Sequence, residues 1–285
     1  MKIAVTGATG NLGRLVVQGL LRERSAQDIV AIVRDVEKAG DFIKKGVQVR
    51  VATYEDPAAL ETALAGVDSL LLISSSEVGK RVSQHKNVID AAKSAGVGYI
   101  VYTSAPKAST STLVLAPEHK ATEEYLAGAG LPYSLVRHNW YTENYKPQVE
   151  TAKRTCTIVA AVGNGRVASA TRADYAAGDI AVLLGRGHEG KVYEFSGDYA
   201  WNYSELAGAI ENIIGKPVRF QSVDADALVG SLKASGLDEG TAGFVAALDG
   251  NIASGLLSET SGELSKLIGR PTTPLEAGLR ASLLA

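Results

Sequence analysis

The chain has 285 residues, of which 46% are hydrophobic and 21% charged, and its formal net charge at pH 7 is −2. This length suits one large α/β domain, or a nucleotide-binding domain with a smaller partner. The near-neutral charge argues against nucleic acid or an anionic membrane as a partner. The single cysteine, Cys156, excludes an intrachain disulfide, and no apolar run approaches the ~20 residues of a membrane span. We therefore expect a cytoplasmic protein.

Short apolar runs and helical patterns alternate through the first 137 residues. Such an alternation predicts right-handed crossovers and a parallel, doubly wound sheet of the Rossmann type. "SLLLIS" has the continuous apolar character of a strand that is buried on both faces. The six predicted strands are "KIAVTG", "IVAIV", "VQVRVA", "SLLLIS", "YIVYTS" and "YSLVR", and helices are expected from about residues 11, 36, 57, 81 and 117.

The pattern changes after Arg137. "CTIVAAVGNGRVASATRADYAAGDIAVLL" predicts a strand, a glycine turn, a second strand and a helix; "KVYEFSG" predicts a further strand, and amphipathic helices follow. We expect a Rossmann-like domain over residues 1–137 and a smaller α+β lobe over residues 138–285 that covers the substrate. Some elements of this lobe are expected to be shared with the first domain.

The segment "VTGATGNLG" lies between the first predicted strand and the first predicted helix. A tight glycine turn lets backbone N–H groups approach a pyrophosphate, and the N-terminus of the helix adds partial positive charge. The strand–turn–helix context makes this a dinucleotide site, whereas isolated glycines would be ordinary turn residues. The candidate cofactor-binding residues of this segment are Thr6, Gly7, Thr9, Gly10, Asn11, Leu12 and Gly13.

The end of the second predicted strand, "AIVRD", bears on the choice between NAD and NADP. Arg34 can pair with a 2′-phosphate and favours NADP, whereas the adjacent Asp35 is the kind of residue that binds a ribose in NAD enzymes. Lys38, one turn into the next helix, restores local positive charge. NADPH is therefore the preferred cofactor, with an ordinary exposed arginine as the alternative interpretation of Arg34.

Hydroxyl-bearing residues follow the fourth and fifth predicted strands, at the edge where parallel sheets bind ligands. Ser74, Ser75 and Ser76 are expected near the cofactor, although a polar turn would have the same composition. Thr103 and Ser104 end the fifth strand and are expected beside the nicotinamide.

These segments together resemble the NmrA-like, atypical short-chain dehydrogenase family, and within it the NAD(P)H:quinone oxidoreductase branch. The resemblance covers nearly the whole chain and includes "AVTGATGNLG", "IVAIVRD", "LLLISSSEVGKR", "EHKATE", "NWYTENY" and "SATRADYAA". The triphenylmethane dye reductases of the same family are similar, but less closely. The resemblance implies NADPH bound at the strand ends and two-electron reduction of a quinone. The chain departs from its relatives at His138, where they tend to have asparagine, and in "YTSAPKAS".

The catalytic tyrosine of typical short-chain dehydrogenases is missing. Those enzymes use Tyr-x-x-x-Lys, in which the lysine lowers the pKa of the phenol that protonates the substrate oxygen. Alignment on Glu123 places His119 at the lysine position and Leu115 at the tyrosine position, and no Tyr-x-x-x-Lys occurs in the chain. A quinone needs little acid catalysis, because its reduced anion is delocalised. His119 is either a proton donor, since the ordinary pKa of histidine lies near working pH, or a packing residue.

The segment "RHNWYTENY" joins the two predicted parts. Its aromatic residues are suited to lining the binding site of an aromatic substrate; alternatively, they form a core between the two domains. We take His119, Asn139 and Tyr141 as the candidate catalytic residues, and add Arg137, His138 and Trp140 to the cofactor-binding candidates.

The leading hypothesis is an NADPH-dependent quinone reductase that works by direct hydride transfer, without flavin or metal. The alternatives are a reductase of triphenylmethane or other aromatic dyes and an NADP(H)-sensing regulator that controls a protein partner. The expected partner is a small aromatic acceptor such as a quinone. The sequence leaves a homodimer open.

Overall fold

The computed structural model describes residues 1–284 and divides into two compact units. The sequence predicts a domain boundary after Arg137, and one segment of the first unit ends one residue later, at His138. The segment Arg172–Phe195, expected in the C-terminal lobe, belongs to the first unit. The first unit comprises Met1–Ser109, Leu115–His138 and Arg172–Phe195, and the second comprises Thr110–Val114, Asn139–Thr171 and the chain from Ser196 onward.

The first unit is built on a seven-stranded sheet in the order β3-β2-β1-β4-β5-β6-β9. All six pairings are parallel, so the predicted Rossmann-like, doubly wound fold is confirmed. The strands are β1 (Ile3–Val5), β2 (Ile29–Val33), β3 (Gln48–Val51), β4 (Ser69–Leu72), β5 (Tyr99–Ser104), β6 (Tyr133–His138) and β9 (Val192–Phe195).

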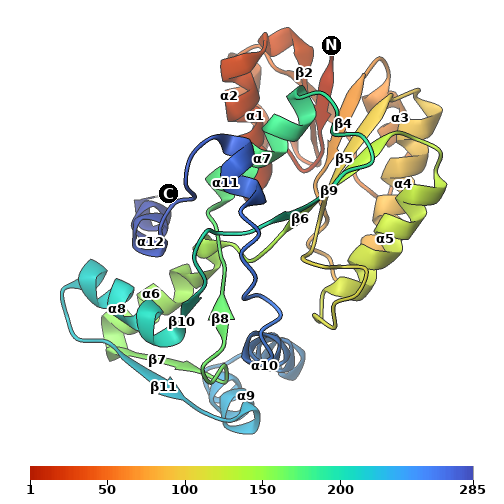
Figure 1. Ribbon diagram of the computed structural model, residues 1–285. Helices are drawn as coiled ribbons and strands as arrows, with labels where there is room; N and C mark the ends of the chain where they lie inside the picture. Colours follow the sequence, from red (N-terminus) through yellow and green to blue (C-terminus); the bar gives the residue numbers. More distant parts are fainter. Residues whose placement is uncertain (285) are drawn as a thin grey trace. The chain divides into compact units, whose positions relative to one another are not determined.

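Helices cover both faces of this sheet, which is why β1, β2 and β4 are buried along their whole length. Helices α3, α4 and α5 lie on one face, and α1 and α7 pack together on the other (Figure 1). The expected helix over residues 36–45 is a 3₁₀ turn followed by a short α-helix. The helices are α1 (Asn11–Glu23), α2 (Gly40–Lys44), α3 (Pro57–Leu64), α4 (Arg81–Ser94), α5 (Ala116–Gly128) and α7 (Arg172–Leu184), with 3₁₀ turns η1 (Ala26–Asp28) and η2 (Val36–Ala39).

Strands β1 and β4 are neighbours whose following helices, α1 and α4, lie on opposite faces of the sheet (Figure 1). The chain segments that follow these strands therefore diverge at the carboxyl ends, and the crevice expected at such a point is the usual ligand site of these sheets. Just beyond the strands, the backbone N–H of Thr6 still donates to the carbonyl of Leu71 at 3.1 Å. The crevice therefore begins directly above Thr6.

The second unit contains two small sheets, one of β7 paired in parallel with β11 and one of β8 paired antiparallel with β10. Its core includes Tyr145, which lies edge-on to Trp201 with ring centroids 4.8 Å apart. Its elements are η3 (Thr142–Tyr145), α6 (Lys146–Thr155), β7 (Thr157–Ala160), β8 (Arg166–Val167), β10 (Trp201–Asn202), α8 (Tyr203–Ile214), β11 (Arg219–Ser222), α9 (Ala225–Ala234), α10 (Glu239–Ala253), α11 (Glu263–Ile268) and α12 (Leu275–Leu284).

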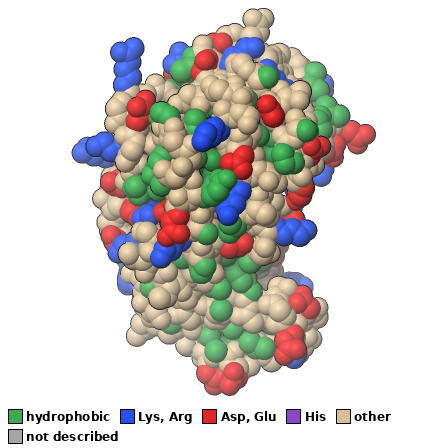
Figure 2. All heavy atoms as spheres, turned by 90° about the vertical axis from the view of Figure 1, so that its right-hand side faces the viewer, with side chains coloured by type: hydrophobic (Ala, Val, Ile, Leu, Met, Phe, Trp, Pro, Cys, Tyr) green, Lys and Arg blue, Asp and Glu red, His purple; other side chains and the backbone are tan. Residues whose placement is uncertain are grey.

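Surface charges of both signs are mixed on the face that Figure 2 shows. On α5, Lys120 lies 4.0 Å from Glu124, and the Tyr125 hydroxyl donates to Asp90 of α4 at 2.7 Å. Among the helices formed by residues 1–284, none combines the length and the hydropathy that crossing a bilayer requires.

Candidate active site

The glycine loop between β1 and α1 has the geometry of an anion cradle. Gly7 has a φ of +58°, a left-handed conformation that favours glycine, and its carbonyl accepts the N–H of Gly10 at 2.9 Å. Helix α1 begins at Asn11, with Gly10 as its N-cap, and within residues 1–284 no side chain caps it. The first N–H groups of the helix are therefore left for a ligand, and the dipole adds positive character there.

Gly13 brings the first turn of α1 directly onto this loop. A Cβ atom at this position would lie 2.7 Å from the Cα atom of Ala8 and closer still to the carbonyl oxygen of Gly7. Both neighbours are backbone atoms, so a side chain here would force the helix and the loop apart. The close approach of α1 to the loop therefore requires a glycine at this position.

Thr6 and Tyr54 brace the loop from below. The Thr6 hydroxyl oxygen accepts the N–H of Ile73 at 3.1 Å and lies 2.6 Å from the hydroxyl of Tyr54, which donates to it. Thr6 is fully buried, so its side chain acts as a structural link between β1 and β4. Burial raises the pKa of Tyr54, so its phenol stays protonated as a donor. The sequence pattern does not mark Tyr54, since its partner lies 48 residues away.

Three basic side chains surround the end of β2. Arg34 is 73% exposed and lies 3.4 Å from a carboxylate oxygen of Glu77, whereas Asp35 accepts the N–H of Glu37 at 2.9 Å and so caps η2. Arg14 donates from Nε to the carbonyl of Thr9 at 3.0 Å and from Nη2 to that of Lys38 at 2.6 Å. Asp35 is therefore occupied as a helix cap, while Arg14 and Lys38, together with Arg34, place positive charge beside the loop. Sequence reasoning overlooks Arg14 because it lies inside a helix.

The loop after β4, residues 74–76, is held by buried side chains. The N–H of Ser74 donates to the Thr103 hydroxyl at 2.8 Å, and the N–H of Ser75 donates to Nε2 of His85 at 2.9 Å. Ser74 and Ser75 are half-buried and Ser76 is exposed. Thr103 therefore joins the ends of β4 and β5, as a neighbour of the predicted cofactor loop.

Ser104 and Arg137 belong to an ionic network at the carboxyl ends of β5 and β6. The Ser104 hydroxyl donates to Oε1 of Glu123 at 2.6 Å. The guanidinium of Arg137 donates to both oxygens of Glu123, at 2.9 and 2.6 Å, and to Glu194 at 2.8 Å. Charge-assisted, two-pronged bonds of this kind fix side chains firmly. Two carboxylates and a guanidinium are thus paired with one another at the carboxyl ends of β5 and β6.

His119 is buried next to this network. Its Nδ1 lies 2.8 Å from the hydroxyl of Tyr102, and its Nε2 lies 3.5 Å from the guanidinium of Arg81. Burial, aided by the charge of Arg81, lowers the pKa of His119 to about 3. A neutral imidazole has no additional proton to give at neutral pH, so this arrangement favours the packing and positioning alternative.

His138 is also enclosed within the first unit. Its Nε2 lies 2.8 Å from Oδ1 of the fully buried Asp179, and its ring stacks on Tyr175 with centroids 4.5 Å apart. These contacts join the end of β6 to helix α7. Helix α7 thus supplies both a carboxylate and an aromatic face to the His138 ring.

The remaining predicted residues lie in the second unit. The Asn139 side chain accepts the N–H of Trp140 at 2.6 Å and donates to the carbonyl of Leu257 at 3.2 Å. Tyr141 forms a parallel bridge with Ala170 and is half-buried. The candidate catalytic residues are thus divided between the units, with His119 in the first and Asn139 and Tyr141 in the second.

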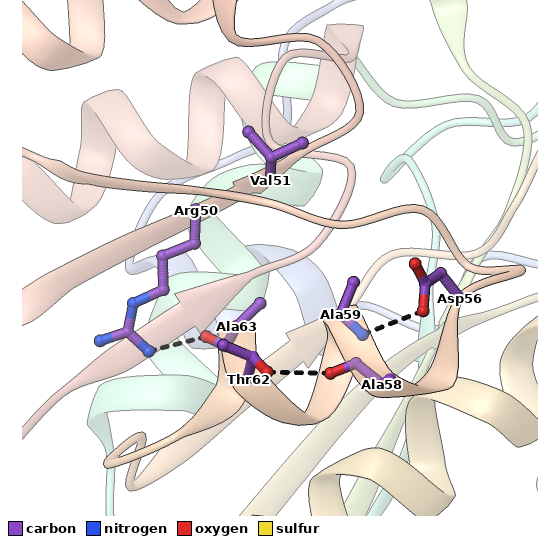
Figure 3. Close-up of a pocket in the computed structure, with 7 residues that line it drawn as sticks. All are labelled: Arg50, Val51, Asp56, Ala58, Ala59, Thr62 and Ala63. Carbon is purple, nitrogen blue, oxygen red and sulfur yellow. Dashed lines mark hydrogen bonds between the residues drawn. The ribbon is translucent and has the colours of Figure 1, made fainter.

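A separate hollow of about 390 Å³ lies along α3 and the edge strand β3, and Figure 3 shows its lining. Its polar groups already have partners: Arg50 donates to the carbonyl of Ala63 at 2.7 Å, and Asp56 accepts the N–H of Ala59 at 3.0 Å. Thr62 likewise donates to the carbonyl of its own helix. The hollow thus belongs to the packing of α3 on the sheet edge and is no part of the crevice.

The glycine loop, the basic group at β2 and the crevice between β1 and β4 define a dinucleotide-binding protein. The NAD(P)H-binding family matches residues 7–183, and the chain belongs to this family. It is 49% identical to Quinone oxidoreductase 2 of Escherichia coli over 273 residues, which are 96% of each chain.

Two solved structures extend the comparison. A crystal structure of the NADPH-dependent quinone oxidoreductase of E. coli in complex with NADPH matches 99% of this chain and 100% of its own, with 48% identity and a TM-score of 0.95. The triphenylmethane reductase of Citrobacter sp. in complex with NADP(H) matches the same shares, with 38% identity and a TM-score of 0.94. The resemblance inferred from the sequence motifs is confirmed.

Proposed function

We propose that the protein is an NADPH-dependent reductase that transfers two electrons to quinones. The observation that carries the proposal is a dinucleotide cradle between β1 and α1, in a sheet whose neighbouring strand ends hold Arg137 paired with Glu123 and Glu194. The cradle fits NADPH because α1 leaves its first N–H groups for the pyrophosphate. The relative at 49% identity is named a quinone oxidoreductase, which supports the choice of acceptor.

The basic group at the end of β2 supports NADPH over NADH. Among the described residues, Arg34 forms one exposed ion pair, with Glu77, and such a surface interaction of about 0–1 kcal/mol is easily given up for a 2′-phosphate. Arg14 is anchored at two carbonyls and keeps its charge at the base of this site. One carboxylate oxygen of Asp35 caps η2 and the other lies 3.9 Å from Nζ of Lys38, so both oxygens already have partners within the protein.

When bound, NADPH would supply a hydride from its nicotinamide, and the task of the protein is to hold the acceptor ring beside it. Proximity and orientation provide most of the acceleration for such a step. The product anion of a quinone is delocalised, so water can supply the proton. The neutral, buried state of His119 agrees with this scheme, because no imidazolium acid is required.

An aromatic dye reductase is the second candidate, favoured by the 38% identity to the triphenylmethane reductase. The two are separated by NADPH oxidation at 340 nm with the purified, flavin-free protein and either a benzoquinone or a triphenylmethane dye. A higher kcat/KM for the quinone supports the proposal, and the reverse order supports the dye. Tight NADPH binding without turnover of either acceptor would indicate the sensing regulator instead.

A further inference from the structure

Both backbone polar groups of Ser75 are bonded by buried side chains of helix α4. Its N–H donates to Nε2 of His85 at 2.9 Å, and its carbonyl accepts Nε of Arg81 at 2.6 Å. The two side chains lie one helical turn apart, so a single helix face holds both ends of the residue. His85 is 1% and Arg81 8% exposed, which makes these interior contacts.

Hydrogen bonding determines the tautomer of His85. Since Nε2 accepts the Ser75 N–H, the ring proton lies on Nδ1, which is 3.0 Å from the Thr122 hydroxyl. Thr122 in turn donates to the carbonyl of Glu118 at 2.9 Å. Burial, together with the charge of Arg81, lowers the pKa of His85 to about 3, so Nε2 remains an acceptor at neutral pH.

Arg81 is oriented by groups on α5. Its Nη1 lies 3.5 Å from Nε2 of His119 and 4.0 Å from a carboxylate oxygen of Glu118. The other oxygen of Glu118 accepts the N–H of Gly79, further along the same loop, at 2.9 Å. His119 therefore supports the guanidinium that holds the Ser75 carbonyl.

These bonds act on one wall of the crevice at the switch point. The loop after β4 is tied by its N–H groups to β5 at Ser74, to α4 at Ser75 and to α5 at Gly79. The other wall is the glycine loop. Backbone groups that are satisfied by rigid neighbours keep a ligand-binding loop in one conformation and reduce the entropy lost on binding.

We propose that His85 and Arg81 are positioning residues that hold the backbone N–H and carbonyl of Ser75. The loop of residues 74–76 is thereby preformed to receive the sugar hydroxyl groups of NADPH. The inference rests on the proposed function, because it assumes that NADPH occupies the crevice. His119 takes part indirectly, as a neighbour of Arg81. None of the three side chains has to touch the acceptor.

The test compares two substitutions at one position. His85→Gln keeps an acceptor that can reach the Ser75 N–H, whereas His85→Leu removes it. The matched control is His188→Leu, since this half-buried histidine bonds to Tyr193, at the other end of the sheet. For each protein one measures amide hydrogen exchange over residues 73–79, the NADPH dissociation constant by fluorescence titration, and KM and kcat with a benzoquinone.

We expect faster exchange and about tenfold weaker NADPH binding in His85→Leu, since loss of one buried hydrogen bond corresponds to roughly that factor. His85→Gln should restore both within about threefold, and His188→Leu should change neither. KM for NADPH should rise more than kcat falls. If His85 had only a structural role, both His85 variants would lose thermal stability, but KM for NADPH would not rise more than kcat falls.

Unchanged NADPH affinity in a folded His85→Leu protein would overturn the inference, as would a His85→Gln protein that binds as weakly as His85→Leu. If His85→Leu does not fold, Arg81→Met removes the carbonyl contact and carries the same expectation. NADPH binding does not depend on the acceptor. A wild-type protein that binds NADPH but reduces no quinone would refute the proposed function and still test the positioning role; one that binds no NADPH would refute both.

Discussion

Gly13→Ala is the substitution whose effect follows most directly from the geometry. The new methyl group would lie 2.7 Å from the Cα atom of Ala8, with the Gly7 carbonyl oxygen closer still. Neither atom can rotate away, so α1 and the loop must separate. Overpacking of this kind costs about 1–3 kcal/mol of unfolding free energy. Because the same movement opens the pyrophosphate cradle, we also expect NADPH binding to weaken by about tenfold or more.

Two other helix glycines serve as controls. Gly208→Ala in α8 places its methyl group in open space among the described residues and should stabilise the protein by about 0.5–1 kcal/mol. Gly19→Ala in α1 meets only the flexible end of Ile180, so it should lower stability with little effect on NADPH. Thermal unfolding and NADPH titration of the three variants test the series. If Gly13→Ala binds NADPH as tightly as the wild type, the pyrophosphate does not bind at the glycine loop.

Three further substitutions give expected outcomes. Arg34→Ala should weaken NADPH about tenfold and leave NADH nearly unchanged; equal weakening of both would refute the 2′-phosphate site. Burial raises the pKa of Asp249 to about 6, so its carboxyl holds a proton more tightly in the folded state, and stability is lost as pH rises from about 4 through 6. In urea unfolding, Asp249→Asn should therefore gain more unfolding free energy over the wild type at pH 8 than at pH 5, by about 1–1.5 kcal/mol; an equal difference at both pH values would contradict this. The pKa of His119 is instead depressed, to about 3, so stability is lost as pH falls from about 6.5, by about 1.4 kcal/mol per pH unit. His119→Gln should lose less stability than the wild type between pH 7 and pH 5 in urea unfolding, and parallel losses would refute the buried, neutral state.

The sequence predicts those parts of the fold that are encoded locally. The strand–turn–helix around Gly7 and the six strands of the N-terminal part are confirmed, because apolar runs and glycine spacing act over short distances. The place of β9 could not be predicted in this way. Its apolar run is recognisable, but the pairing with β6 follows an excursion of the chain through the second unit. A local pattern cannot state which sheet a strand joins.

The same limit applies to the site. Arg137 and Thr6 have residue types that suit cofactor contacts, and only the structure shows their side chains engaged with Glu123 and Tyr54. For His119 an ordinary pKa could be assumed from the sequence, whereas burial beside Arg81 lowers it. These partners are 14 to 48 residues apart in the sequence, so no local motif could predict their contacts.

We propose that hydride transfer requires the protein to hold the acceptor beside the nicotinamide and requires no acidic side chain to donate a proton. The most direct test is the pH dependence of kcat for NADPH oxidation with a benzoquinone between pH 6 and 8.5, for the wild type and His119→Gln, with the uncatalysed rate subtracted. We expect saturable turnover in both proteins, with a kcat that changes little between pH 6 and 8.5. A kcat that falls through an ionisation near pH 7 in the wild type, and loses that ionisation in His119→Gln, would contradict it.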